Sequence, residues 1–134
     1  MTTAMLRYTL FAIVTLVAFA SPKAHATAYF GLEPDIVTNY LGQDSKKLGF
    51  VRVSIELMLE DASYLEVAQH HTPLMRATAI DIFGQQPENK VKSLVGREEI
   101  RKDILRNLRN LMEKETGAPM IEDVIFTKYL YQGS

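Results

Sequence analysis

The sequence contains no cysteine among its 134 residues. Disulfides, thiolate metal sites and cysteine nucleophiles are therefore excluded, and side-chain packing alone must stabilise the fold. The chain also lacks a surplus of charge of either sign, since 15 basic residues stand against 16 acidic ones. This balance gives no reason to expect nucleic-acid binding or a polybasic patch for anionic lipid.

Recognisable catalytic patterns are equally scarce. The chain has no G-x-S-x-G turn, no glycine-rich phosphate loop and no H-E-x-x-H helix. His70 and His71 are adjacent, so on a helix they point about 100° apart and do not readily share a metal ion. The acidic pairs Glu60–Asp61, Glu98–Glu99 and Glu122–Asp123 lie at the boundaries of apolar segments, which is typical of helix capping. We predict no enzyme, no catalytic residue, no metal site and no cofactor; a metal or pH-switch role for the histidines and acid–base work by the pairs remain the alternatives.

The first 26 residues have the layout of a secretory signal. Arg7 precedes the uncharged, almost wholly apolar residues 8–20, and Ala24 and Ala26 supply small side chains at the two positions that a signal peptidase reads. The apolar run is shorter than the roughly 20 residues of a membrane span. We predict a signal peptide over residues 1–26 and one domain over residues 27–134, with an uncleaved, short membrane anchor as the alternative. Cleavage removes two basic residues and leaves a net charge of −3.

Two segments of the remaining sequence predict strands ahead of the helical region. Residues 50–60 place apolar side chains at every second position, which indicates a strand with one buried face. Residues 29–41 read as an extended segment, with a bend or an edge position at Pro34.

Helical spacing follows in residues 61–84 and again in residues 97–115. We expect Asp61 or Ser63 to cap the first region, and Pro73 to kink or split it with Thr72 as a second cap. Residues 85–96 read as a polar connection. Residues 121–132 are rich in β-branched and aromatic residues and predict a final strand. The fold class is therefore α+β, with a small antiparallel sheet packed by two helices.

The last predicted strand has apolar side chains on both faces. Simple alternation places Val124, Phe126 and Leu130 on one face and Tyr129 and Tyr131 on the other, outer face. Tyrosine is enriched at the energetic centres of protein interfaces. We take Tyr129 and Tyr131 as candidate contact residues for a partner; burial within the sheet is the alternative.

The second predicted helix carries a cluster of basic residues, among them Arg101 and Arg109. These two side chains are candidate contacts for an acidic partner. The alternative is an ordinary solvated helix face, because Glu98 and Asp103 interleave with the arginines.

Several segments, in the same order along the chain, resemble the periplasmic domain of the flagellar protein family FliL. Residues 32–34 (LEP) resemble its opening segment, and residues 50–57 (FVRVSIEL) resemble its amphipathic strand. Residues 73–76 (PLMR) and 96–101 (GREEIR) resemble its proline–apolar–apolar–arginine run and the start of its second helix. Residues 123–132 (DVIFTKYLYQ) resemble its closing strand. The resemblance covers nearly all of residues 29–132.

The resemblance implies a fold similar to the stomatin-like (SPFH) domain, an α+β unit that assembles into rings. It implies a non-enzymatic protein of the flagellar basal body that supports the motor and its stator units in motility, with motor proteins and copies of itself as partners. It places the domain in the periplasm, free or anchored to the inner membrane. Typical members have a full membrane span and a linker, and the shorter leader here departs from that pattern. A periplasmic ligand- or lipid-binding module, with a pocket between sheet and helices, is the alternative function.

Overall fold

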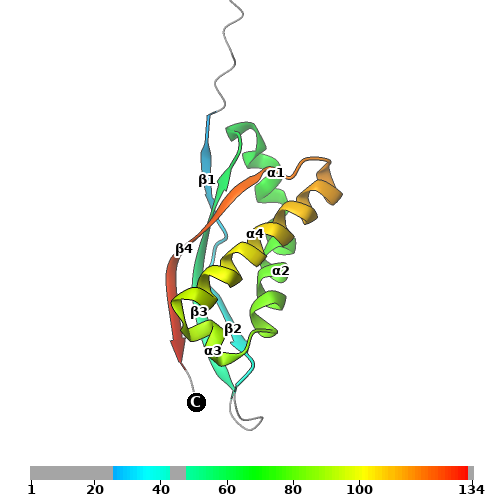
Figure 1. The fold of residues 1–134 in the computed structure, drawn as a ribbon. Helices are drawn as coiled ribbons and strands as arrows, with labels where there is room; N and C mark the ends of the chain where they lie inside the picture. Colours follow the sequence, from blue (N-terminus) through cyan, green and yellow to red (C-terminus); the bar gives the residue numbers. More distant parts are fainter. Residues whose placement is uncertain (1–25, 43–47, 133–134) are drawn as a thin grey trace, which may run out of the picture.

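The structure is a computed structural model that describes residues 26–42 and 48–132. The elements are β1 (Ala28–Gly31), β2 (Ile36–Tyr40), β3 (Gly49–Leu59), the short 3₁₀ helix η1 (Ala62–Tyr64), α1 (Leu65–His70), α2 (Thr72–Gly84), α3 (Glu88–Lys92), α4 (Leu94–Thr116) and β4 (Ile121–Gln132). Figure 1 shows the helices gathered on one side of the sheet.

A four-stranded antiparallel sheet forms one layer, with β3 at its centre. β1 pairs with the second half of β3 and β2 with the first half, while β4 pairs along nearly the whole length of β3. β1 and β2 therefore share one edge of β3, and β4 occupies the other. The segment predicted as one extended stretch is two strands, interrupted around Pro34, which has no N–H to donate to a ladder. The predicted α+β fold with a small antiparallel sheet is confirmed.

The core lies between one face of this sheet and the helices α2 and α4. The alternation predicted for β3 is confirmed, because the side chains at its odd-numbered positions from Val51 to Leu59 are all buried. Each helix repeats its buried residues every three or four positions, so a single stripe faces the sheet. The fully buried residues are Met75, Ala79 and Phe83 of α2, and Ile100, Ile104, Leu108 and Met112 of α4.

The start of the helical region follows the prediction only in part. Asp61 caps η1, since its Oδ1 accepts a hydrogen bond from the Ser63 N–H at 2.8 Å. Pro73 divides the region into α1 and α2, because proline fits the first turn of a helix but not its interior. The prediction that Thr72 caps α2 is wrong. Thr72 is the first residue of α2, and His71 occupies the cap position without a side-chain hydrogen bond.

The segment predicted as a polar connection contains the whole of α3 and the first residues of α4. Ser93 caps α4, with its Oγ accepting from the Gly96 N–H at 2.9 Å. A Cβ on Gly96 would come within 2.0 Å of the Lys90 carbonyl oxygen, so glycine allows α3 and α4 to approach closely. α4 thus begins at Leu94 rather than at Arg97. It ends at Thr116, one residue beyond the predicted range, and Gly117 follows as its C-cap with a φ of 85°.

Candidate interaction surface

A β-bulge decides which face the C-terminal aromatic residues occupy. β4 pairs Lys128 with Ser54 and Phe126 with Ile55, so Thr127 is an extra residue with no opposite partner on β3. An extra residue of this kind reverses the alternation of side chains along the rest of its strand.

Beyond the bulge, Tyr129 and Tyr131 are paired with the buried Val53 and Val51 of β3. Directly paired residues share a face, so both tyrosines lie on the helix-covered side and Leu130 lies on the other side. The predicted placement of the tyrosines on the outer face is wrong, and the reason is the bulge.

The two tyrosines differ in how firmly they are held. The Tyr129 hydroxyl donates to the Val91 carbonyl oxygen at 2.7 Å, and its ring centroid lies 5.5 Å from that of Phe126. Burial raises the pKa of Tyr129 to about 12. Tyr131 is 48% exposed, with Lys92 Nζ 5.9 Å from its ring centroid. Tyr129 is therefore part of the packed layer, whereas Tyr131 presents a surface.

Arg101 and Arg109 turn toward β4 and not away from the molecule. Nη1 of Arg101 donates to the Val124 carbonyl oxygen at 3.1 Å, and Nη1 of Arg109 donates to the Ile121 carbonyl oxygen. Backbone carbonyls that lack a partner in a sheet are costly when shielded from water. The two arginines therefore fasten α4 to the strand beside it.

The acidic pairs singled out in the sequence supply partners for the same arginines. The Glu60 carboxylate lies 3.0 Å from Arg109, and the Asp123 carboxylate lies 2.6 Å from Arg101. Glu98 lies one helical turn before Arg101 and is 2.5 Å from it. The Glu60–Arg109 and Asp123–Arg101 pairs join the ends of β3 and β4 to α4, and the Glu98–Arg101 pair lies within α4. All three are a structural use of the charges.

The two adjacent histidines lie at the junction of α1 and α2. Nδ1 of His71 is 2.8 Å from the Val67 carbonyl oxygen, and the two imidazole rings are 5.5 Å apart, edge to face. Within the part of the chain that the structure describes, no group of three or more histidine, aspartate or glutamate side chains could hold a metal ion.

A shallow apolar groove lies on the sheet face opposite the helices. Val37, Phe50 and Leu130 line it with exposed fractions of 62, 46 and 58%, and its volume is about 490 Å³. Arg52 is paired with both Val37 and Leu130, so its cation lies between apolar side chains. Tyr131, whose side chain lies on the helix-covered side, is also among the residues that line the groove. Exposed large apolar residues that cluster in this way are typical of a contact surface.

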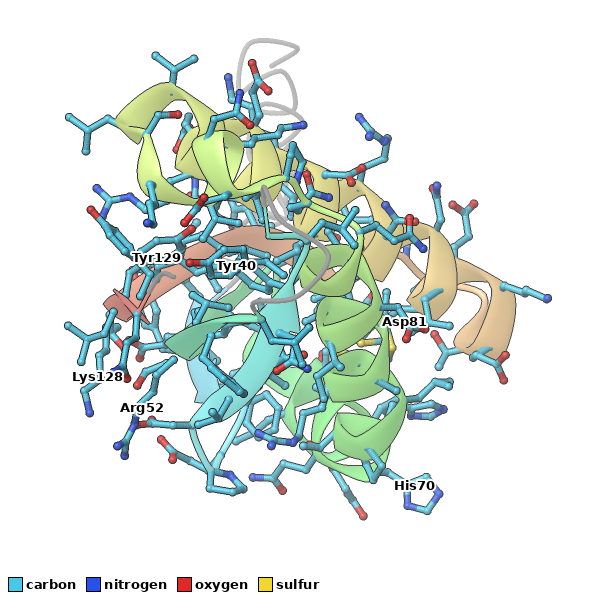
Figure 2. All side chains as sticks on the ribbon, turned by 90° about the horizontal axis from the view of Figure 1, so that it is seen from below. Tyr40, Arg52, His70, Asp81, Lys128 and Tyr129 are labelled. Carbon is cyan, nitrogen blue, oxygen red and sulfur yellow. The ribbon has the colours of Figure 1, made fainter. Side chains whose placement is uncertain are left out.

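A network of hydrogen bonds around Asp35 borders the groove and ties three parts of the sheet together. Its carboxylate accepts from the Ser54 hydroxyl, from Lys128 Nζ at 3.2 Å and from Arg52 Nε at 3.0 Å. These hydrogen bonds, the one from Ser54 foremost, lower the pKa of Asp35 to about 2. Figure 2 shows Arg52 and Lys128 together on the side of the sheet away from the helices.

Of the predicted cleavage positions, Ala24 lies outside the described residues, and Ala26 is at the start of them. The Ala26 carbonyl oxygen accepts from the Ala62 N–H at 2.8 Å. None of the helices in the described ranges is long and apolar enough to cross a membrane. The boundary between leader and domain therefore remains a prediction.

The fold and these surfaces define a class: a small two-layer α+β domain whose exposed features suit contact with another macromolecule. The family model for the flagellar basal body-associated protein FliL matches residues 29–132, and the chain belongs to the FliL family. The chain is also similar to the flagellar protein FliL of Aquifex aeolicus (strain VF5), with 24% identity over 103 residues. That match covers 77% of this chain and 60% of the relative, so the chain spans about three-fifths of the relative's length. The predicted family is confirmed.

Proposed function

We propose that this protein is a non-enzymatic part of the flagellar basal body that supports the motor and its stator units from the periplasm. The family match over residues 29–132 carries the proposal. The charges described above support it, because the prominent carboxylates pair with arginines and lysines of the fold and not with one another. A protein that acts by contact needs no reacting groups.

The groove on the helix-free face is the contact that we assign to a motor component. Its partner is a segment that presents apolar side chains on either side of a carboxylate, because Val37 and Leu130 flank the cation of Arg52. Apolar side chains supply most of the binding energy of such a contact, and the charge pair fixes its register.

The position of the protein in living cells tests this proposal. A C-terminal fusion to a fluorophore that folds in the periplasm should form foci at the base of each flagellum. Val37→Asp, which places a charge on an exposed groove residue, should disperse these foci and reduce swimming. Leu74→Asp is the matched control, because Leu74 is 40% exposed on α2, away from the groove. A uniform periplasmic rim from an intact wild-type fusion would refute the motor role.

A periplasmic ligand- or lipid-binding module is the second candidate. Buried apolar side chains of the core lie between the sheet and the helices, where this function would need its pocket. The groove, however, has a volume within the range of ligand sites. A small molecule that co-purifies with the protein and is lost on Val37→Asp, detected by native mass spectrometry, would favour this function.

A further inference from the structure

The free edge of β4 carries backbone groups that point away from the rest of the sheet. The Ile55 carbonyl oxygen accepts from the Leu32 N–H. The backbone N–H and C=O groups of the odd-numbered residues of β3 therefore point toward the edge that holds β1 and β2. The residues opposite them on β4 form non-hydrogen-bonded pairs with β3. In such a pair the backbone groups of both residues point away from each other, so the N–H and C=O groups of these β4 residues point outward. These outward residues of β4 are Ile121, Val124, Phe126, Tyr129 and Tyr131.

The first part of this edge, from Ile121 to Val124, is closed by side chains. Arg109 and Arg101 donate hydrogen bonds to the outward carbonyl oxygens of Ile121 and Val124, respectively. The outward N–H of Val124 donates to the Asp123 carboxylate at 2.8 Å. Capped groups cannot pair with another strand, so the edge is protected from Ile121 to Val124.

The second half, residues 128–132, is open. Of the residues that the structure describes, none caps the outward N–H or C=O groups of Tyr129 and Tyr131. A lysine on an edge strand ordinarily discourages pairing. Here the charge of Lys128 is countered by Asp35, which lies across the sheet at 3.2 Å. Figure 1 shows this end of β4 at the margin of the molecule.

We propose that this open edge pairs with the same segment of a second copy, antiparallel and centred on Leu130. In that register Tyr129 lies opposite Tyr131 of the second copy, and both tyrosines exchange N–H···O bonds with their counterparts. Lys128 lies opposite Gln132, so no like charges meet. Aromatic residues directly opposite each other stabilise a strand pair, and the segment is therefore complementary to itself.

A second observation also points to a copy of this chain. The joint between α3 and α4 lies over the same end of β4, since Val91 binds the Tyr129 hydroxyl and the Arg97 guanidinium is 5.2 Å from the Tyr129 ring centroid. At this joint Leu94 and Val95 are 75 and 72% exposed. A two-fold axis through the strand pair keeps both helix layers on one face of the joined sheet. Leu94 and Val95 of each copy then flank the axis, where the second copy covers them.

Such a dimer is isologous, because the same surface of each copy forms the contact, and it is complete with two copies. It is therefore distinct from the contact that builds a ring. The proposal does not depend on the flagellar role. The absence of cysteine allows a direct test, because a single introduced thiol reports on one position. In the purified full chain under mild oxidation, Leu130→Cys should form a disulfide-linked dimer, since opposite residues of a non-hydrogen-bonded pair bring their Cβ atoms close. Val37→Cys, on the same face at the opposite edge, should stay monomeric.

A proline pair separates edge pairing from damage to the fold. Tyr131→Pro removes an outward N–H and leaves the ladder with β3 intact, so the protein should fold and its dimer dissociation constant should rise at least tenfold. Asn39→Pro does the same on the free edge of β2 and should leave that constant unchanged. Sedimentation velocity over a concentration series measures both. A Leu130→Cys protein that stays monomeric, or a wild-type protein that binds only a different protein at this edge, would overturn the assignment.

Discussion

The two halves of β4 belong to one strand, yet the fold treats them differently. In residues 121–124 the edge carbonyls are held by arginines, and Ile121 and Val124 are fully buried. In residues 128–132 the edge is uncapped, and Leu130 and Tyr131 are about half exposed. An exposed, unpaired edge is a liability that proteins usually cover. The comparison teaches that α4 closes only the part of the edge that the fold needs for its own stability.

The bulge at Thr127 separates the two halves. It allows Phe126 and Tyr129, which are three residues apart, to pack side by side against Phe83. It also moves Lys128 and Leu130 to the open face, where they meet Asp35 and the groove. The bulge therefore determines both the packing of one half and the surface of the other.

Tyr129→Ala should break the comparison with the largest effect, because Tyr129 lies beyond the bulge and still belongs to the packed layer. Its ring packs beside Phe83 and Phe126, and its hydroxyl donates to the Val91 carbonyl oxygen. Truncation leaves a cavity and an acceptor without its donor. We expect a loss of about 3 kcal/mol in the free energy of unfolding, measured by urea titration.

Tyr131→Ala is the matched control, because Tyr131 lies two residues further along the same face of β4 and is 48% exposed. The expected loss is below about 1 kcal/mol. Equal losses for the two variants would contradict the assignment of Tyr129 to the packed layer.

Arg101→Met should open the protected half of the edge, with an intermediate effect. The Val124 carbonyl and the Asp123 carboxylate lose their donor, and an unsatisfied, shielded group of this kind costs about 1–3 kcal/mol. Lys102→Met, at the next and exposed position of α4, should change stability by less than about 0.5 kcal/mol. Thermal unfolding of the two variants side by side measures the difference, and a similar shift in both would show that Arg101 contributes only charge.

The protected half also marks the limit of what the sequence predicts. Period-two alternation in residues 50–60 and the repeated apolar stripes of the helices are local patterns, so they gave the fold class correctly. The positions of Arg101 and Arg109 beside the apolar stripe of α4 were visible as well. The direction of their long side chains was not, because it depends on which strand edge lies next to the helix.

The bulge and α3 escaped prediction for related reasons. A bulge is defined by the count of residues on two paired strands, and the pattern of one strand does not contain that count. The spacing of Phe126 and Tyr129, three residues in a strand that otherwise repeats every two, is the signal that could have revealed it. α3 has five residues with Val91 as the only apolar one, which is too short to show a period.

Asp35→Asn should sharpen the comparison with the smallest effect, because Asp35 ties Lys128 of the open half to the rest of the sheet. A pKa lowered from 3.8 to about 2 means that the folded state favours the carboxylate. The carboxylate therefore contributes stability above pH 3.8, and this contribution disappears as the pH falls toward 2. Wild type should exceed the variant in urea midpoint at pH 7, and the gap should close between pH 4 and 2, modestly because the site is near solvent. Glu33→Gln, which removes the charge of an exposed neighbour, is the control. A gap that stays constant with pH would mean that Asp35 acts through its shape and not through its charge, and Lys128 would then have to be countered by another group for the edge of β4 to pair.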